Sequence, residues 1–327
     1  MKVNSPDISK QIFREDVLSV MEKRYSTVGS AWVDHQMDWC NGVYASFKDH
    51  DKFLIVIFLV KKTLDFYSRN FIQSAYEEFY SKDTVEIGRF NISEISKELC
   101  IPKESTRRKV IELEELGVLR KNKKCMVIDR SKFHFTKPKN TIVRISRFLA
   151  LLSEMCLKEN ILLKKITSEE LEIVIKNNFS YIWKMYYELQ IPTMINYKKI
   201  FKDLETFHIF GTCAVNQHLF AKNIPEVSMD RNNFIKNIST SKIMQGINAM
   251  SISDITGIPR ATVIRKLKNL VKIKNLTIDK KKHYRLSGNF TKTLMPLQKN
   301  VLIQLSKFSS QIFNQYLLKK KYEDPFI

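Results

Sequence analysis

The sequence predicts a mainly α-helical protein in which a unit of two helices and a small β-hairpin occurs twice, joined by linking helices. The chain has 327 residues but only 8 Gly and 8 Pro, so few residues break helices. Hydrophobic residues make up 44% of the chain, which is normal for a globular core, and they seldom alternate with polar ones. The chain also resembles itself when shifted by 157 residues, a period that indicates a duplicated domain and not a solenoid of short units.

The repeat aligns without a gap over its central part. Three dipeptides recur at this shift, namely Ile95-Ser96 as Ile252-Ser253, Ile101-Pro102 as Ile258-Pro259, and Arg108-Lys109 as Arg265-Lys266. With the shift relaxed to 160, the similarity continues into amphipathic helices at 141–157 and 298–318. Four regions follow: an N-terminal helical region at 1–84, the first unit with its trailing helix at 85–157, linking helices at 158–235, and the second unit with its trailing helix at 236–327.

The regions outside the units are predicted to be helical. Residues 1–50 are expected to form helices whose register the sequence does not define. Residues 53–60 are all apolar, and an amphipathic pattern follows them to about Tyr80. This pattern predicts a buried helix. Residues 160–235 predict two or three linking helices, and residues 207–213 are interpreted as a turn or a short strand.

The first unit begins with a short helix. Ile92, Ile95 and Leu99 form its apolar stripe, and Asn91 or Ser93 is suited to cap it.

A second helix follows the turn at Ile101-Pro102. The residue before proline is pushed out of the α region, and proline suits the first turn of a helix. The buried stripe of this second helix is expected to be Thr106, Val110 and Leu113. Gly117 is expected to end the helix in the left-handed conformation, and residues 120–124 then form a basic hairpin tip between two short β-prone runs.

The second unit follows the same order. A capping box at 251–254 is expected to start its first helix, and Gly257-Ile258-Pro259 makes the turn. The second helix carries the stripe Val263, Leu267 and Leu270. Strands at 276–278 and 283–286 flank a lysine-rich tip.

Charge indicates the class of partner. Lys and Arg number 55 against 34 Asp and Glu, which gives a formal net charge of +21 and a pI near 9.6. Such an excess attracts a polyanion, although solubility in a lysine-rich proteome is an alternative explanation. The five cysteines are odd in number and lack CxxC spacing, which is typical of reduced thiols. With no signal peptide and no apolar run long enough to span a bilayer, we expect a soluble cytoplasmic protein that associates with the nucleoid and not with membranes.

The order of helix, tight turn, helix and basic hairpin resembles the winged helix-turn-helix of bacterial transcriptional regulators. The resemblance rests on residues 95–118 and, more closely, on residues 252–267, and it indicates no particular family within this class. It implies a fold of two winged helix-turn-helix domains related by internal duplication. It also implies that the second helix of each unit lies in the DNA major groove while the hairpin tip lies by the backbone.

The residues expected to contact DNA are basic, small polar or apolar side chains of these helices and tips. They are Lys103, Ser105, Arg107, Arg108, Arg120, Lys121, Lys123 and Lys124 in the first unit, and Arg260, Thr262, Ile264, Arg265, Lys280, Lys281 and Lys282 in the second. Glu104 would repel phosphate unless it accepts from cytosine or pairs with Arg108. The two units therefore differ in the side chains that they present to DNA, and the second unit is expected to recognise the DNA sequence more strongly. Whether the first contacts DNA or only packs is left open.

No catalytic or metal-binding pattern occurs. The clusters around His208 and Cys213 and around His35 and Cys40 lack zinc spacing and are interpreted as core residues. Phosphate loops and nucleophile motifs are absent from the sequence, so we expect no cofactor, no metal and no enzymatic activity.

The hypothesis from sequence is therefore sequence-specific binding of double-stranded DNA by a transcriptional regulator that acts as an intrachain pseudo-dimer. Two alternatives stay open: a replication initiator of the plasmid or phage kind, and a protein-interaction scaffold built on winged helices. Self-association through the apolar trailing helices is also left open.

Overall fold

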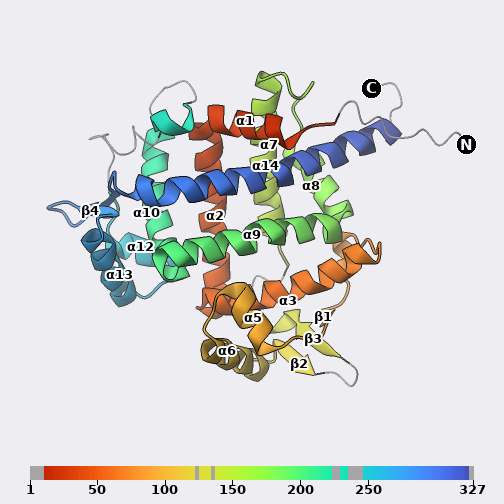
Figure 1. Cartoon of the computed structure of the whole chain (residues 1–327), viewed down its shortest axis with the longest axis horizontal. Helices are drawn as coiled ribbons and strands as arrows, with labels where there is room; N and C mark the ends of the chain where they lie inside the picture. The colour runs from red at the N-terminus through yellow and green to blue at the C-terminus, as the bar shows by residue number, and fades with distance from the viewer. Residues whose placement is uncertain (1–10, 122–124, 134–136, 223–228, 235–245, 324–327) are drawn as a thin grey trace, which may run out of the picture.

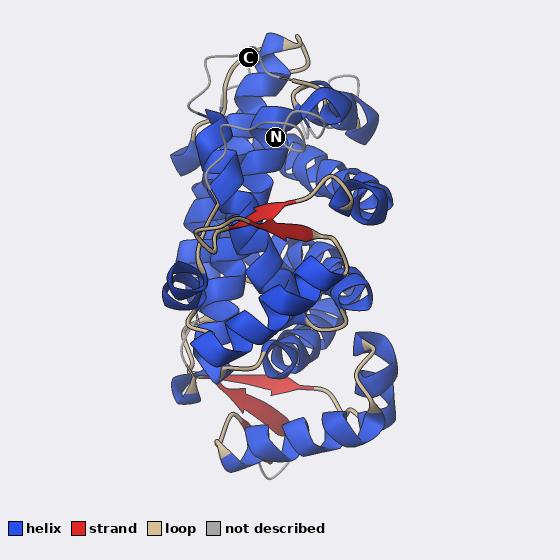
Figure 2. Cartoon of the chain, turned by 90° about the vertical axis from the view of Figure 1, so that its left-hand side faces the viewer, coloured by secondary structure: helices blue, strands red, loops and turns tan. Residues whose placement is uncertain are grey.

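The computed structural model describes residues 11–121, 125–133, 137–222, 229–234 and 246–323. Within these ranges the protein is mainly helical, with two small antiparallel sheets at separate places, as predicted (Figure 2). No helix of the described ranges is both long and apolar enough to cross a bilayer.

The first half of the chain contains seven of the labelled α-helices and one sheet. Its elements are α1 (Arg14–Lys23), α2 (Tyr25–Phe47), α3 (His50–Arg69), α4 (Tyr76–Phe79), β1 (Thr84–Ile87), α5 (Ile92–Leu99), α6 (Lys103–Glu115), β2 (Leu119–Lys121), β3 (Met126–Asp129), the short η2 (Arg130–Lys132) and α7 (Lys139–Lys158). The strands lie in the order β1-β3-β2, with Thr84 opposite Asp129 and Leu119 opposite Ile128. We call residues 84–129 the first module.

The second half repeats this order within the described residues. Its elements are α8 (Ser168–Asn177), α9 (Phe179–Phe201), α10 (Leu204–Lys222), α12 (Ala249–Thr256), α13 (Arg260–Lys272), β4 (Leu276–Ile278), β5 (Tyr284–Leu286) and α14 (Phe290–Glu323). Strands β4 and β5 pair with Leu276 opposite Leu286, and Ile247 forms a single bridge to Tyr284 on the position that β1 holds in the first sheet. We call residues 247–286 the second module.

The helices of the two modules correspond at the offset that relates the two sequence repeats. Helix α5 spans residues 92–99 and α12 spans 249–256, while α6 spans 103–115 and α13 spans 260–272. Cys100 and Gly257, which end α5 and α12, are both left-handed. The Ser96 hydroxyl donates to the Ile101 carbonyl at 2.7 Å, and Ser253 donates to Ile258 at the same distance. The two turns therefore have the same construction.

Local capping agrees with the expectations in one module and corrects them in the other. Asn91 caps α5 by accepting from the Glu94 amide at 2.7 Å. The expected capping box at 251–254 is wrong, because α12 begins at Ala249 and Asn248 caps it by accepting from the Ser251 amide. Asn91 and Asn248 align in the two sequence repeats, so the capping asparagine is the equivalent residue in both modules.

The helices before each module correspond at a slightly different offset. Helices α1 and α8 have 10 residues each, and α2 and α9 have 23 each. The tripeptide Phe47-Lys48-Asp49 recurs as Phe201-Lys202-Asp203 at the ends of α2 and α9. Both lysines have positive φ, and each aspartate accepts hydrogen bonds from backbone amides at the start of the next helix.

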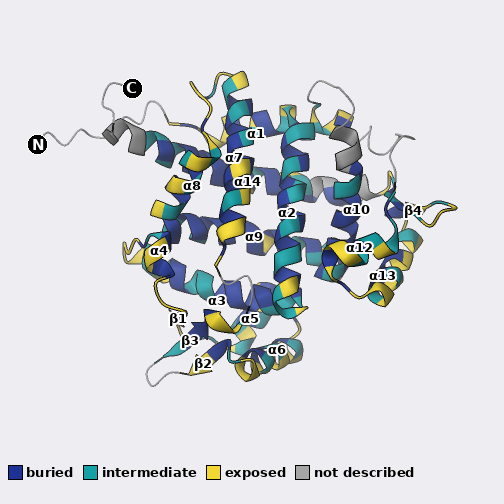
Figure 3. Cartoon of the chain, turned by 180° about the vertical axis from the view of Figure 1, so that it is seen from behind, coloured by how far each residue is buried: buried dark blue, intermediate teal, exposed yellow. Residues whose placement is uncertain are grey.

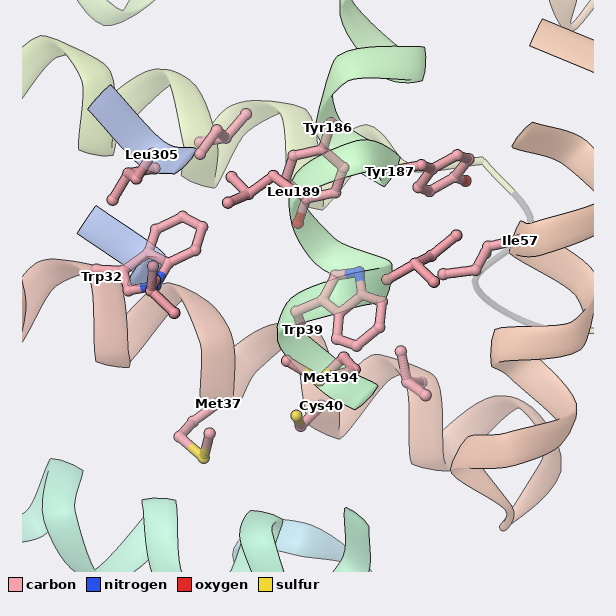
Figure 4. Close-up of a cluster of buried hydrophobic side chains, with 14 of the residues drawn as sticks. Trp32, Met37, Trp39, Cys40, Ile57, Tyr186, Tyr187, Leu189, Met194 and Leu305 are labelled. Atoms are coloured by element: carbon pink, nitrogen blue, oxygen red, sulfur yellow. The ribbon is translucent and has the colours of Figure 1, made fainter. Parts of the chain in front are cut away.

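The core lies where helices of the two halves cross. Helix α3 packs on α9, α10 on α2, α1 on α14, and α7 on α8 (Figure 1). Trp32 and Trp39 of α2 lie with Tyr186 and Met194 of α9 in this core (Figure 4). Burying one large apolar side chain contributes about 1.5–3 kcal/mol, so this crossing holds the halves together.

The structure corrects two further expectations outside the modules. The buried helix expected to reach Tyr80 ends at Arg69, where Asn70 and the left-handed Phe71 turn the chain back. Residues 207–213 are neither a turn nor a strand but lie inside α10. They are apolar because α2 and the second module cover them, which removes the helical periodicity that sequence interpretation needs.

The trailing helices are longer than the stretches 141–157 and 298–318 expected from the sequence, since α7 spans Lys139–Lys158 and α14 spans Phe290–Glu323. Residues 160–222 contain three linking helices, α8, α9 and α10. The expected apolar stripes of α7 and α14 are buried, including Ile145 and Leu305, and they pack on α1, α2, α8 and α9. These stripes are therefore used within the chain, and association of two chains would need another surface.

Candidate nucleic-acid interface

Helix α13 presents a basic face that its own packing orients. Pro259 precedes the helix with φ −53°, and Val263, Leu267 and Leu270 are buried at 0% exposure. Arg260 and Arg265 are exposed on the outer side. Among the described residues neither arginine forms an ion pair, so both guanidinium groups are available to a ligand.

The charge of α13 has a single sign. Its 13 residues include five Lys or Arg and no Asp or Glu. Lys268 and Lys272 are exposed and extend the face that begins at Arg265. The sequence analysis missed these two lysines because it considered the start of the helix, although their i+3 and i+7 spacing from Arg265 was visible. Thr262 and Ile264 are half-buried beside this face.

Lys266, in contrast, is buried and holds α13 on the rest of the protein. Its side chain is 7% exposed, and its Nζ lies 2.6 Å from Oδ1 of Asp203 and 3.1 Å from the Thr206 hydroxyl. Burial favours the protonated form of Asp203, but the hydrogen bonds from Lys266 and Thr206 outweigh it and lower the pKa of this carboxyl. The pairing fixes how α13 sits on the start of α10.

The hairpin of the second module places three lysines at its tip. Lys280, Lys281 and Lys282 are exposed. Asp279 closes the turn by accepting from the amides of His283 and Lys281, each at 2.9 Å, and these bonds lower its pKa. The one acid of residues 276–286 therefore accepts from backbone amides through Oδ1, while its Oδ2 lies 3.6 Å from the Arg285 guanidinium.

Helix α6 has the same length as α13 and is buried in an equivalent way, but its exposed residues differ. Its 13 residues include four Lys or Arg and four Glu. Lys103, Arg107 and Arg108 are exposed and Ser105 is half-buried. The expected Glu104–Arg108 pair is not the one that forms. Arg107 pairs with Glu104 at 3.0 Å, and Arg108 lies 3.6 Å from Glu112.

Lys109 of α6 corresponds to Lys266 of α13 and has an equivalent partner. Its Nζ forms an ion pair with Asp49, the residue that caps α3, as Asp203 caps α10. The dipeptides Arg108-Lys109 and Arg265-Lys266 place an arginine and a lysine at adjacent positions of each helix. In the structure only the arginine of each pair is solvated, because the lysine lies one position round the helix, against the core.

The first hairpin is partly neutralised. Arg120 is exposed and its guanidinium lies 2.5 Å from the buried carboxylate of Asp129. Lys121 is exposed. The predicted contacts Lys123 and Lys124 lie outside the described residues.

The two modules lie along one edge of the molecule. Figure 1 shows α13 at the left and α6 at the bottom, with the C-terminal ends of α2 and α9 between them. Figure 3 shows exposed residues along both α6 and α13, whereas α2 and α9 are mostly buried or half-buried. The exposed Lys48 and Lys202 follow those helix ends. The sequence analysis missed this pair, although the repeated Phe-Lys-Asp tripeptide was a signal for it.

The histidine and cysteine clusters are parts of the core. Among the described residues no group of three or more His, Cys, Asp or Glu is arranged to hold a metal ion. His35 makes a hydrogen bond of 3.0 Å with Tyr186, and His208 one of 2.7 Å with Asn41. Burial lowers the pKa of His35 to about 3, so its imidazole is neutral at ordinary pH.

The chain matches no protein-family model, no curated protein and no solved structure. Its function is therefore inferred from the side chains and charges described above.

Proposed function

We propose that this protein binds double-stranded DNA in a sequence-specific manner, as a transcriptional regulator associated with the nucleoid. The observation that carries the proposal is α13, a helix that follows a tight turn, precedes a lysine-tipped hairpin and contains no acidic residue. Four of its five basic residues are exposed, namely Arg260, Arg265, Lys268 and Lys272. DNA is a polyanion whose phosphates supply most of the attraction, and an unopposed basic helix of this kind suits it.

The element order of both modules supports winged helix-turn-helix domains related by duplication. A strand or bridge, two helices and a hairpin occur in the same order, and the helices have equal lengths in the two modules. The correspondence of α1, α2 and α3 with α8, α9 and α10 extends the proposed duplication to most of the chain. Such a chain acts as a pseudo-dimer and favours a pseudo-palindrome with unlike half-sites.

In this proposal the N-terminal part of α13 enters the major groove. Arg260 and Arg265 carry bidentate donors that suit guanine, Thr262 bonds to either base edge or to phosphate, and Ile264 contacts a thymine methyl. The lysines at 280–282 then lie by the neighbouring backbone and add affinity without sequence preference.

Helix α6 contributes less in the same proposal. Glu104 and Glu112 occupy Arg107 and Arg108, so DNA must compete with these carboxylates for the arginines. The exposed pairs are worth about 0–1 kcal/mol each, which DNA can overcome, but the glutamates then lie close to phosphate. The first half-site is therefore read more weakly than the second.

Salt-dependent binding tests the proposal. The full chain is titrated into a fluorescein-labelled, mixed-sequence 30-bp duplex at several KCl concentrations, and into duplexes that it selects from a random library. With ~6–8 phosphate contacts, affinity is expected to fall at least a thousandfold between ~50 and ~200 mM salt. Enrichment of a two-part motif is also expected. No binding at 50 mM salt, or binding that is independent of salt, overturns the proposal.

A map of bound sites in cells then identifies the role. Isolated sites at promoters support a transcriptional regulator. Clustered, repeated sites at one replication origin support a replication initiator instead.

A further inference from the structure

The packing between the two halves repeats as pairs of equivalent contacts. Gln36 of α2 donates to Gln190 of α9 at 2.7 Å, and Gln190 donates back at 3.4 Å. The Ser74 amide donates to the Ser180 hydroxyl at 2.9 Å, and the Met229 amide donates to Ser26 at 2.7 Å. Ser26 and Ser180 are the second residues of α2 and α9, and so they are equivalent in the two halves. If the two halves are exchanged, each of these contacts takes the place of its equivalent contact. The halves are therefore related by an approximate two-fold axis that passes between Gln36 and Gln190.

Lys48 and Lys202 exchange under the same relation. Each follows the last residue of its helix with positive φ, 52° and 71°, and each is exposed. Their neighbours Asp49 and Asp203 are paired with the partly buried Lys109 and the buried Lys266. Among the described residues neither Lys48 nor Lys202 forms an ion pair.

Lys48 extends toward the opposite module. Its Nζ lies next to Gly257, in the turn between α12 and α13. A Cβ atom placed on this glycine would be 3.6 Å from the Lys48 Nζ. The same Nζ also lies 5.5 Å from the centre of the Tyr44 ring. The ammonium group is thus beside the turn that positions Arg260, at the end of α2 that lies between the two modules (Figure 1).

We infer that Lys48 and Lys202 form a basic site at the centre of the interface, which binds the phosphates between the two half-sites. The inference rests on the proposed DNA binding and adds contacts that neither module supplies. A duplex that reaches both α6 and α13 passes over the ends of α2 and α9, because these ends lie between the modules. An ammonium on a flexible stem suits phosphate as a point charge, so this site adds affinity but no sequence preference.

The test replaces both lysines in the full chain. Lys48→Gln/Lys202→Gln leaves an uncharged polar side chain at each exposed position and removes two charges. The slope of log affinity against log salt on the mixed-sequence 30-bp duplex is expected to become shallower by about 1.8, and affinity at 100 mM KCl to fall about thirtyfold. Lys48→Arg/Lys202→Arg is expected to restore the slope. Lys164→Gln/Lys307→Gln, which removes two exposed lysines elsewhere, is the charge-matched control and is expected to change neither quantity by more than about twofold.

A second readout separates this inference from the proposed function. In a duplex selected by the wild-type chain, a neutral methylphosphonate between the half-sites is expected to weaken the wild type and to leave the glutamine variant unaffected. If the wild type binds DNA with a steep salt slope and the glutamine variant has the same slope, the central site is wrong and the proposed function stands. If the wild type itself does not bind, both fail. A circular dichroism spectrum and Tm equal to those of the wild type exclude misfolding as the cause of a loss.

Discussion

The first and second modules have nearly the same backbone arrangement but differ in the charges on their second helices. Their helices have equal lengths, their turns form the same serine–carbonyl bond, and in each module an inward-facing lysine pairs with an aspartate that caps a neighbouring helix. Yet α13 has five basic and no acidic residues, whereas α6 has four of each. The buried positions thus resemble each other because packing constrains them, while the exposed positions differ because only a ligand constrains them.

The two modules are therefore expected to contribute unequally to DNA binding. If DNA is the ligand, the second module supplies most of the affinity and sequence preference, and the first module sets the orientation and spacing. Five changes test this contrast, in order of decreasing expected effect.

Removing the two outer arginines of each helix is expected to have the largest effect. Arg260→Ala/Arg265→Ala should weaken binding to a selected duplex at least a hundredfold, because each arginine that contacts guanine contributes about 1–3 kcal/mol. The matched variant Arg107→Ala/Arg108→Ala should weaken it less than tenfold, because these arginines are paired with glutamates. Fluorescence anisotropy measures both, and equal losses would contradict the unequal contributions.

Breaking the buried lysine contacts is expected to destabilise the two halves unequally. Lys266→Met removes a buried charge that contacts Asp203, Thr206 and, at 3.4 Å, Glu205. It should lower the free energy of unfolding by about 2 kcal/mol, less than for a fully buried pair because Asp203 is half-exposed. Lys109→Met removes one contact, to Asp49, and should cost about 1 kcal/mol. Urea denaturation checks the order, and a larger loss for Lys109→Met would reverse it.

Acid is expected to destabilise the protein through the buried histidine His50, whose equivalent residue in the other half of the chain is a leucine. Burial lowers the pKa of His50 to about 3, and Leu204 stands at the matched position of the other half. Because the folded pKa is below the ordinary value of about 6.5, the unfolded chain binds the proton first. The contribution of His50 is therefore fully present above pH 6.5 and is lost as pH falls toward 3, by up to about 1.4 kcal/mol per pH unit.

His50→Leu tests this contribution. Neither ring nitrogen of His50 has a hydrogen-bond partner within the described residues, so leucine removes no such bond there. Urea unfolding at pH 7.5, 6.5, 5.5 and 4.5 should show a flatter pH dependence for the variant than for the wild type. Parallel curves would show that His50 is not buried in its neutral form.

Neutralising the glutamates of α6 is expected to make the first module behave more like the second. Glu104→Gln/Glu112→Gln frees Arg107 and Arg108 and removes two negative charges from the face. It also breaks the 2.6 Å ion pair between Glu112 and Lys52 of α3, so the fold of the variant is checked by its Tm. Affinity for a mixed-sequence duplex should rise about fivefold, or about 1 kcal/mol. Glu188→Gln on α9 is the control, since that exposed acid pairs with Lys184 away from both modules. Unchanged affinity would indicate that α6 does not approach DNA.

The smallest expected effect concerns the left-handed residue that follows the second helix of each module. Gly117 has φ +71°, and its counterpart Lys274 has φ +59°. A left-handed residue other than glycine costs about 1 kcal/mol, so Lys274→Gly should raise the free energy of unfolding by up to this amount. Gly117→Ala should lower it by a similar amount, although space for a Cβ exists at this position. Thermal unfolding measures both, and the same sign for both changes would contradict the matched geometry.

The local structure of the modules was predictable because its signals are local. The starts of α6 and α13 are determined by Pro102 and Pro259, and the sides that these helices bury are determined by their apolar stripes. The left-handed Gly117 determines where α6 ends. The exposed positions of Arg260 and Arg265 follow from the same periodicity. The start of α12 was the exception, because Asn248 caps this helix in place of the expected capping box at 251–254.

Tertiary structure decided the features that depend on residues far apart in sequence. Lys109 and Lys266 resemble solvated residues until folding brings Asp49 and Asp203 to them across 60 and 63 residues. Residues 207–213 are helical although their pattern lacks a polar side, because other helices cover them on every side. Lys48 and Lys202 lie between the modules only because α2 and α9 cross. Sequence by itself therefore determined the two modules and their charges, while the fold determined which lysines are buried and where the others meet a ligand. The physical reason is that helix signals act over one or two turns, whereas burial depends on the whole chain.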